Sequence, residues 1–194
     1  MTKLAPWDRL PPRPGPGLIN VVVETPRGSR NKYKYDEQLG LFRLNRVLFA
    51  GASFPFDFGF VPQTRAGDGD PVDVLVLMDA PAFTGCLVYA RPLGVLRGTK
   101  DGKENPRIIA VSTVDKTWAT HKDLSDLPRR LLREIEQFFQ WILDVEGTEH
   151  RLLGWRGVAE AERIINRATL AQTLEVEREV AKRLRAKNAK KKNR

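Results

Sequence analysis

The chain has 194 residues, a formal net charge of +9 at pH 7 and a single cysteine, so no internal disulfide can form. The length suits one domain with a sizeable core, and no apolar run is long enough to span a bilayer. A lone thiol also fits a reducing compartment. These features predict a cytoplasmic protein without a membrane segment.

The positive charge is concentrated at the C-terminal end. Residues 182–194 carry eight lysines and arginines and no acid, which leaves the rest of the chain nearly neutral. A basic run of this kind is typically a solvated helix end. The alternative is a weak, salt-dependent contact with RNA or another polyanion.

Proline-rich residues 1–17 predict an extended N-terminal arm. Short apolar and β-branched runs bounded by turn residues then predict strands, whereas the aromatic stretch 54–60 predicts a loop. The expected strands are 18–25, 32–36, 41–48, 73–79, 85–97 and 107–114. Apolar residues at helical spacing predict helices at 129–145 and 158–187.

Short strands followed by helices favour an α+β fold with a β-barrel core. We expect three segments along the chain. They are the arm 1–17, a barrel domain with a helix over 18–158, and a C-terminal helix with the basic tail over 159–194.

The acidic turn Asp68-Gly69-Asp70-Pro71-Val72-Asp73 is the most informative motif. Three carboxylates this close repel one another unless a cation lies among them. Hard divalent ions such as Mg²⁺ prefer carboxylate oxygens. Taken alone, Asp-Gly-Asp is as readily an ordinary surface turn.

Other residues surround this turn in a recognisable order. Glu24, Lys32 and Arg46 precede it, and the segment 90–95 follows it. The pattern resembles the soluble family I inorganic pyrophosphatases over about residues 18–158.

The resemblance implies a five-stranded OB-like barrel with flanking helices, commonly assembled as a hexamer. It also implies hydrolysis of diphosphate to two phosphates with Mg²⁺, with Mn²⁺ as the alternative metal. Asp70 would activate the attacking water, and Lys32, Arg46 and Arg107 would contact the phosphates. The candidate metal ligands are Asp68, Asp70, Asp73, Glu24, Asn105 and Asp101, of which Asp101 is a replacement ligand that the family pattern does not itself contain.

Several positions depart from the family pattern. Phe54 and Phe58 stand where tyrosines are usual, Ile142 and Leu143 replace a Tyr-Lys pair, and Lys34 replaces a glutamate. Lys100 and Asn105 replace two aspartates of the metal site. We therefore expect the side chains on one side of the metal site to differ from those of the family.

Four residues are candidates to compensate for these losses. Asp101 and Glu104 lie in the affected loop and are candidate replacement ligands. Lys34 and Lys100 are candidates for the lost phosphate contacts, if their side chains point inward.

Two further functions remain open at this point. One is metal-dependent hydrolysis of another phosphate ester, whose organic group would pack on phenylalanines that are more simply explained as core. The phenylalanines are Phe54, Phe56, Phe58 and Phe60. The other is a non-catalytic OB-like module that binds RNA or a protein partner with its basic tail.

Overall fold

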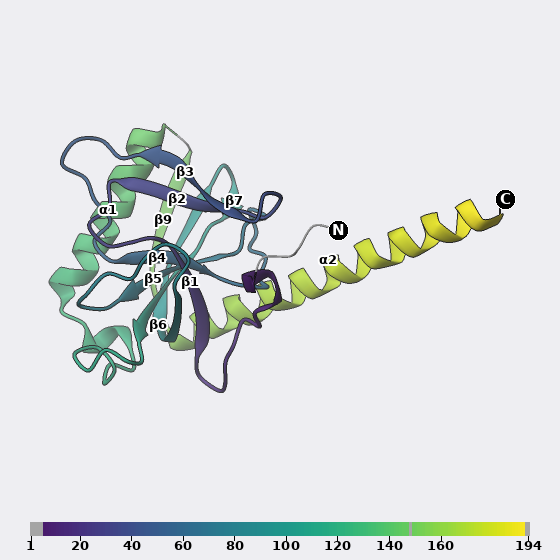
Figure 1. Cartoon of the computed structure of the whole chain (residues 1–194). Helices are drawn as coiled ribbons and strands as arrows, with labels where there is room; N and C mark the ends of the chain where they lie inside the picture. Colours follow the sequence, from purple (N-terminus) through teal and green to yellow (C-terminus); the bar gives the residue numbers. More distant parts are fainter. Residues whose placement is uncertain (1–5, 148, 193–194) are drawn as a thin grey trace.

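Five strands of the computed structural model close into a ring that forms the body of the molecule (Figure 1). The structure describes residues 6–147 and 149–192. The ring strands are, in spatial order, β1 (Ile19–Thr25), β4 (Asp57–Val61), β5 (Val72–Leu77), β8 (Arg107–Ser112) and β6 (Leu87–Lys100), and β6 pairs again with β1. All pairs are antiparallel except β5 with β8. The predicted five-stranded closed β structure is confirmed.

Successive side chains of the ring strands enter two different apolar clusters. Val74 lies in the cluster that α2 (Val158–Lys192) completes, and Leu75 lies in the cluster that α1 (Arg129–Glu146) completes. Strands buried on both faces need apolar residues at nearly every position. The two C-terminal helices of the predicted α+β fold therefore cover opposite sides of the ring strands.

The prediction that the aromatic stretch 54–60 is a loop is wrong for its second half, which belongs to strand β4 (Asp57–Val61). The strand runs antiparallel to both β1 and β5. Gly59 weakens the strand pattern in the sequence, yet the packing requires it. A Cβ at this position would lie 2.1 Å from the carbonyl oxygen of Val22.

Two further strands were not predicted, and both pair with β6 outside the ring. They are the short β7 (Lys103–Glu104) and β9 (His150–Gly157). Strand β9 contains Gly154, whose φ of +80° is left-handed, and the pairing is irregular between Arg97 and Gly98 on β6. Such an interrupted edge strand carries only a weak apolar alternation.

A β-hairpin lies beside the ring as a separate two-stranded sheet, formed by β2 (Asn31–Asp36) and β3 (Leu41–Val47). It is attached to β1 by polar contacts. The hydroxyl of Thr25 accepts a hydrogen bond from the Tyr33 N–H at 3.0 Å, and Glu24 Oε1 accepts one from the Tyr35 N–H at 2.7 Å.

The N-terminal arm packs against both the hairpin and α2. Its 3-10 helix η1 (Pro6–Arg9) carries Trp7, which contacts the rings of Tyr35 and Phe42. Further along, Arg13 forms a 2.6 Å ion pair with Glu162. Residues 1–5 of the predicted arm lie outside the described residues.

Helix α2 continues well beyond the body of the molecule, as Figure 1 shows. Arg65 contacts it through a 2.6 Å ion pair with Glu175. Of the predicted basic tail, residues 193–194 lie outside the described residues. In the part of the chain that is described, no helix is long and apolar enough to cross a membrane. A second 3-10 helix, η2 (Leu124–Asp126), precedes α1.

Candidate active site

A cleft of about 690 Å³ opens between the hairpin, the acidic turn, the loop that follows β6, and α1. Nine of the residues that the sequence nominated as ligands or catalytic groups line it. They are Glu24, Lys32, Arg46, Asp68, Asp70, Asp73, Asp101, Asn105 and Arg107. These residues come from segments far apart in the chain, and the fold brings them together.

The acidic wall is built on the turn that leads into β5. Gly69 has a φ of +94°, a left-handed conformation that glycine adopts without steric cost. Asp68 Oδ1 accepts a hydrogen bond from the Asp70 N–H at 3.1 Å, which tightens the turn. Asp73 lies within β5 and is in register with Arg107 on β8.

Burial and like charges change the acidity of two carboxyls in this wall. Burial raises the pKa of Glu24 to about 7, against the opposing hydrogen bond from the Tyr35 N–H. Burial raises the pKa of Asp73 to about 6, although Arg107 and Lys32 act in the opposite direction. Both carboxylates are in an environment that a positive charge would stabilise.

Two nitrogen donors already contact the acidic wall. Lys34 Nζ lies 2.6 Å from Asp70 Oδ2, and Asn105 Nδ2 donates to Asp68 Oδ2 at 2.6 Å. Desolvation tends to lower the pKa of Lys34, but the hydrogen bond to Asp70 and the neighbouring carboxylates outweigh it, so the pKa is raised. Lys34 therefore points into the cleft.

The basic side of the cleft comes mainly from the hairpin. Lys32 and Arg46 are cross-strand partners in the β2–β3 register, so their side chains lie next to each other on the same face of the hairpin. Arg107 reaches the cleft from β8, where its guanidinium lies 4.7 Å from the Phe139 ring centroid and donates to the Asn105 carbonyl at 3.1 Å.

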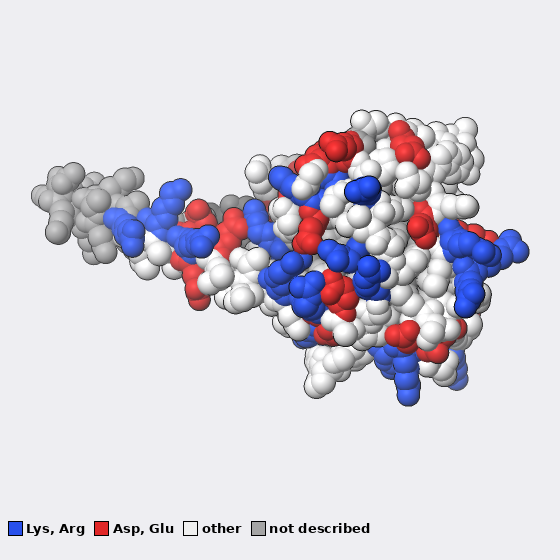
Figure 2. All heavy atoms as spheres, turned by 180° about the vertical axis from the view of Figure 1, so that it is seen from behind, with Lys and Arg blue, Asp and Glu red and all other residues white. Residues whose placement is uncertain are grey.

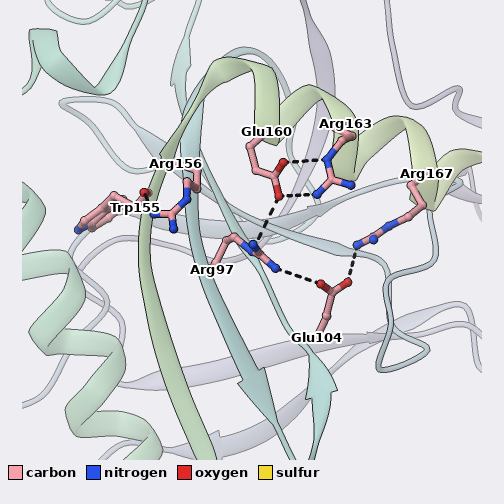
Figure 3. A network of polar contacts seen from close by, with 7 residues as sticks. All are labelled: Arg97, Glu104, Trp155, Arg156, Glu160, Arg163 and Arg167. Atoms are coloured by element: carbon pink, nitrogen blue, oxygen red, sulfur yellow. Dashed lines mark hydrogen bonds and ion pairs between the residues drawn. The ribbon is translucent and has the colours of Figure 1, made fainter.

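The residues of the loop after β6 that were predicted to take part in the site do not all face the cleft. Asp101, Lys100 and Asn105 line the cleft, but Glu104 does not. Its carboxylate pairs with Arg97 of β6 and with Arg167 of α2 (Figure 3). The structure therefore does not place Glu104 as a replacement ligand.

The replaced positions form the apolar end of the same cleft. It is lined there by Phe54, Phe58, Ile142 and Leu143. Phe54 and Phe58 are 2% and 3% exposed and belong to the core cluster that α1 completes. Their burial supports their interpretation as core and not as a platform for an organic group.

Two basic residues of the cleft were missed by the sequence reasoning. Arg65 and Lys103 both line it, from the loop after β4 and from β7. An isolated basic residue in a polar segment carries no distinguishing sequence pattern. Only the three-dimensional arrangement shows that Arg65 and Lys103 line the cleft.

The donor chemistry of the acidic wall fits a hard divalent cation, because it consists of carboxylate oxygens. Over the described residues, no group of three acidic, histidine or cysteine side chains converges as a preformed metal cluster. The contacts of Lys34 and Asn105 hold two of the carboxylates in place instead. Carboxylate oxygens beside basic side chains in one cleft are the groups that metal-assisted phosphoryl transfer uses, so the site is typical of the metal-assisted phosphohydrolases.

Comparison with known proteins narrows this class. The family model described as inorganic pyrophosphatase matches residues 21–172, and the chain belongs to the inorganic pyrophosphatase family. The resemblance seen in the sequence is thereby confirmed.

Individual relatives agree with this assignment. The inorganic pyrophosphatase of Nostoc sp. is 39% identical over 163 residues, covering 84% of this chain and 96% of the relative. That of Leifsonia xyli is 43% identical over 147 residues, covering 75% and 90%. The crystal structure of the Thermus thermophilus inorganic pyrophosphatase superposes with a TM-score of 0.82 at 33% identity, covering 87% and 99%.

Proposed function

We propose that the protein hydrolyses inorganic diphosphate to two phosphates at this cleft. The observation that carries the proposal is the convergence of the acidic turn with Lys32, Arg46 and Arg107 in one cleft of a chain that belongs to the inorganic pyrophosphatase family. Diphosphate is densely negative, so its hydrolysis depends on charge neutralisation and in-line positioning.

The proposed cofactor is Mg²⁺, with Mn²⁺ as the alternative. Asp68, Asp70 and Asp73 would hold the metal, and the further oxygen donors are Glu24, Asn105 and Asp101. When bound, such an ion screens phosphate charge and lowers the pKa of a bound water.

The side chains of this protein have separable roles in the proposal. Asp70, which is 53% exposed, accepts the proton of the attacking water. Lys32, Arg46 and Arg107 bind and orient the phosphate oxygens, and the arginines do so with two parallel hydrogen bonds where geometry allows.

Phosphate release from diphosphate in the presence of Mg²⁺ tests this function directly. We expect release from the wild-type chain, with kcat lowered about a hundredfold or more by Asp70→Asn, which keeps the size of the side chain but removes the proton acceptor. Release at the level of Asp70→Asn would contradict the proposal. The same panel should include a phosphate monoester, because preferential release from it would favour the other phosphohydrolase function.

We also propose a homo-oligomer, specifically the hexamer implied by the family resemblance. Large side chains exposed on the ring body support a buried subunit contact, among them Phe83 at 71% and Val114 at 81% exposed. Sedimentation equilibrium of the full chain distinguishes one chain from six.

A further inference from the structure

Lys34 places a positive charge directly on the acidic wall. The side chain reaches across from β2 to the turn before β5, and its ammonium lies 2.6 Å from Asp70 Oδ2. Asn105 makes a similar contact from the other side, to Asp68 at 2.6 Å. Protein N–H groups therefore occupy carboxylate oxygens on both sides of the turn.

The contact between Lys34 and Asp70 is readily exchanged. The Lys34 side chain is 36% exposed and that of Asp70 is 53% exposed. An ion pair at such a position contributes little net stability, and the flexible lysine stem can leave it without disturbing the strand. Lys34 can hold Asp70 in one state of the site and contact another anion in the next.

The charge of Lys34 acts against a divalent ion at the same carboxylate. A positive charge a few ångströms away repels Mg²⁺ strongly enough to lower its affinity by an order of magnitude, even when water screens the pair. Diphosphate reverses this balance, because its negative charge attracts both the metal and the lysine.

We propose that Lys34 is a built-in counter-cation at Asp70, which makes binding of the divalent ion at this carboxylate dependent on diphosphate. This inference rests on the proposed function in taking the acidic turn as the metal-binding wall. The metal at Asp70 then binds together with diphosphate, and Lys34 moves from the carboxylate to the phosphate oxygens.

Calorimetric titration of the intact protein with Mg²⁺, alone and with a non-hydrolysable diphosphonate, tests the proposal without any turnover. We expect Lys34→Gln to bind Mg²⁺ about tenfold more tightly than the wild type in the absence of the diphosphonate. The diphosphonate should strengthen Mg²⁺ binding to the wild type more than to Lys34→Gln. Lys34→Arg, which keeps the charge, should behave as the wild type.

Lys103→Gln is the matched control, since it removes one positive charge from the same cleft and Lys103 lies on the separate β7. Its Mg²⁺ affinity should change much less than that of Lys34→Gln, because the ion pair with Asp70 is made by Lys34 and solvent screens a charge that is not in direct contact. Lys34→Ala provides a second neutral variant if Lys34→Gln folds poorly.

Equal or weaker Mg²⁺ binding by both neutral Lys34 variants would overturn the proposal. If Mg²⁺ affinity were unchanged in them while the diphosphonate bound more weakly, Lys34 would be a phosphate ligand only. A failure of the proposed function looks different, because a wild-type chain that releases no phosphate can still show the Lys34 effect on Mg²⁺ affinity.

Discussion

At the scale of single residues, the lack of a side chain at Gly59 allows β4 to lie close to β1 in the ring. At Gly59 a Cβ would meet three backbone atoms of β1, the nearest being the Val22 carbonyl oxygen at 2.1 Å. We expect Gly59→Ala to lower the free energy of unfolding by about 2–4 kcal/mol, because the backbone and not a flexible side chain must move. Urea denaturation measures the change.

Gly15→Ala is the control for that substitution. A Cβ at Gly15 meets nothing within 4 Å. The change should be neutral or raise the free energy of unfolding by up to about 1 kcal/mol, by restricting the unfolded chain. Equal stability of Gly59→Ala and the wild type would show that the β1–β4 contact adapts more easily than its geometry indicates.

The same scale shows how far a sequence specifies a site. The three aspartates are close in the chain, so their proximity was predictable from local spacing. Glu104 and Asn105 were both nominated as ligands, but neighbouring residues in an extended segment point to opposite sides. Asn105 faces the cleft, and Glu104 faces Arg97 and Arg167. The contact of Lys34 with Asp70 depends on how the hairpin lies beside the ring, which no local pattern encodes.

At the scale of elements, the hairpin that carries Lys32, Lys34 and Arg46 depends on the N-terminal arm. The Trp7 ring centroid lies 5.5 Å from that of Tyr35 and 5.2 Å from that of Phe42. Because the hairpin is a separate two-stranded sheet, side-chain packing must supply much of its stability.

We expect Trp7→Ala to loosen the hairpin and weaken diphosphonate binding by about 1 kcal/mol, or roughly fivefold. Amide hydrogen exchange over residues 31–47 should become faster, while β5 and β8 stay protected. Trp7→Phe should restore most of both properties.

Leu170→Ala serves as the comparison, since this exposed apolar side chain lies on α2. It should leave exchange in the hairpin unchanged. Unaltered exchange in Trp7→Ala would mean that the contacts with β1 and the stacking of Tyr35 on Phe60 of β4 hold the hairpin without the arm.

Elements with a continuous pattern were predictable from the sequence, and interrupted ones were not. The long apolar runs of β1, β5 and β8 and the helical spacing of α1 appear directly in the chain. Strand β4 was missed because Gly59 interrupts it, and β9 because its side chains alternate only weakly between partly buried and exposed positions. In both cases pairing with a neighbouring strand decides the structure, and that information is not local.

At the scale of the whole molecule, charge is unevenly distributed between the body and the end of α2. Figure 2 shows blue and red side chains interspersed over one face of the body. On the body, Arg97, Arg163 and Arg167 are balanced by ion pairs with Glu104 and Glu160 (Figure 3). The run 182–194 lacks such balance. We therefore assign any polyanion binding to this run.

Ending the chain after Ala181 tests that assignment, because it keeps the ion pair between Arg65 and Glu175. We expect unchanged phosphate release and thermal midpoint, and loss of the weak binding to single-stranded RNA measured by fluorescence anisotropy at low salt. Loss of phosphate release on truncation would instead connect the tail with the cleft. A full chain that releases no phosphate but binds RNA through residues 182–194 would favour the non-catalytic, tail-dependent function.

The order of strands in the ring has a consequence for synthesis of the protein. Strand β8 is the last of the five to leave the ribosome, yet it lies between β5 and β6. Until residue 112 is available, the facing edges of both neighbours are unpaired, which is the condition under which strands associate between chains. A nascent chain arrested before that point therefore exposes two unpaired strand edges. The cleft is completed later still, because Arg107 of β8 and then Ile142 and Leu143 of α1 line it.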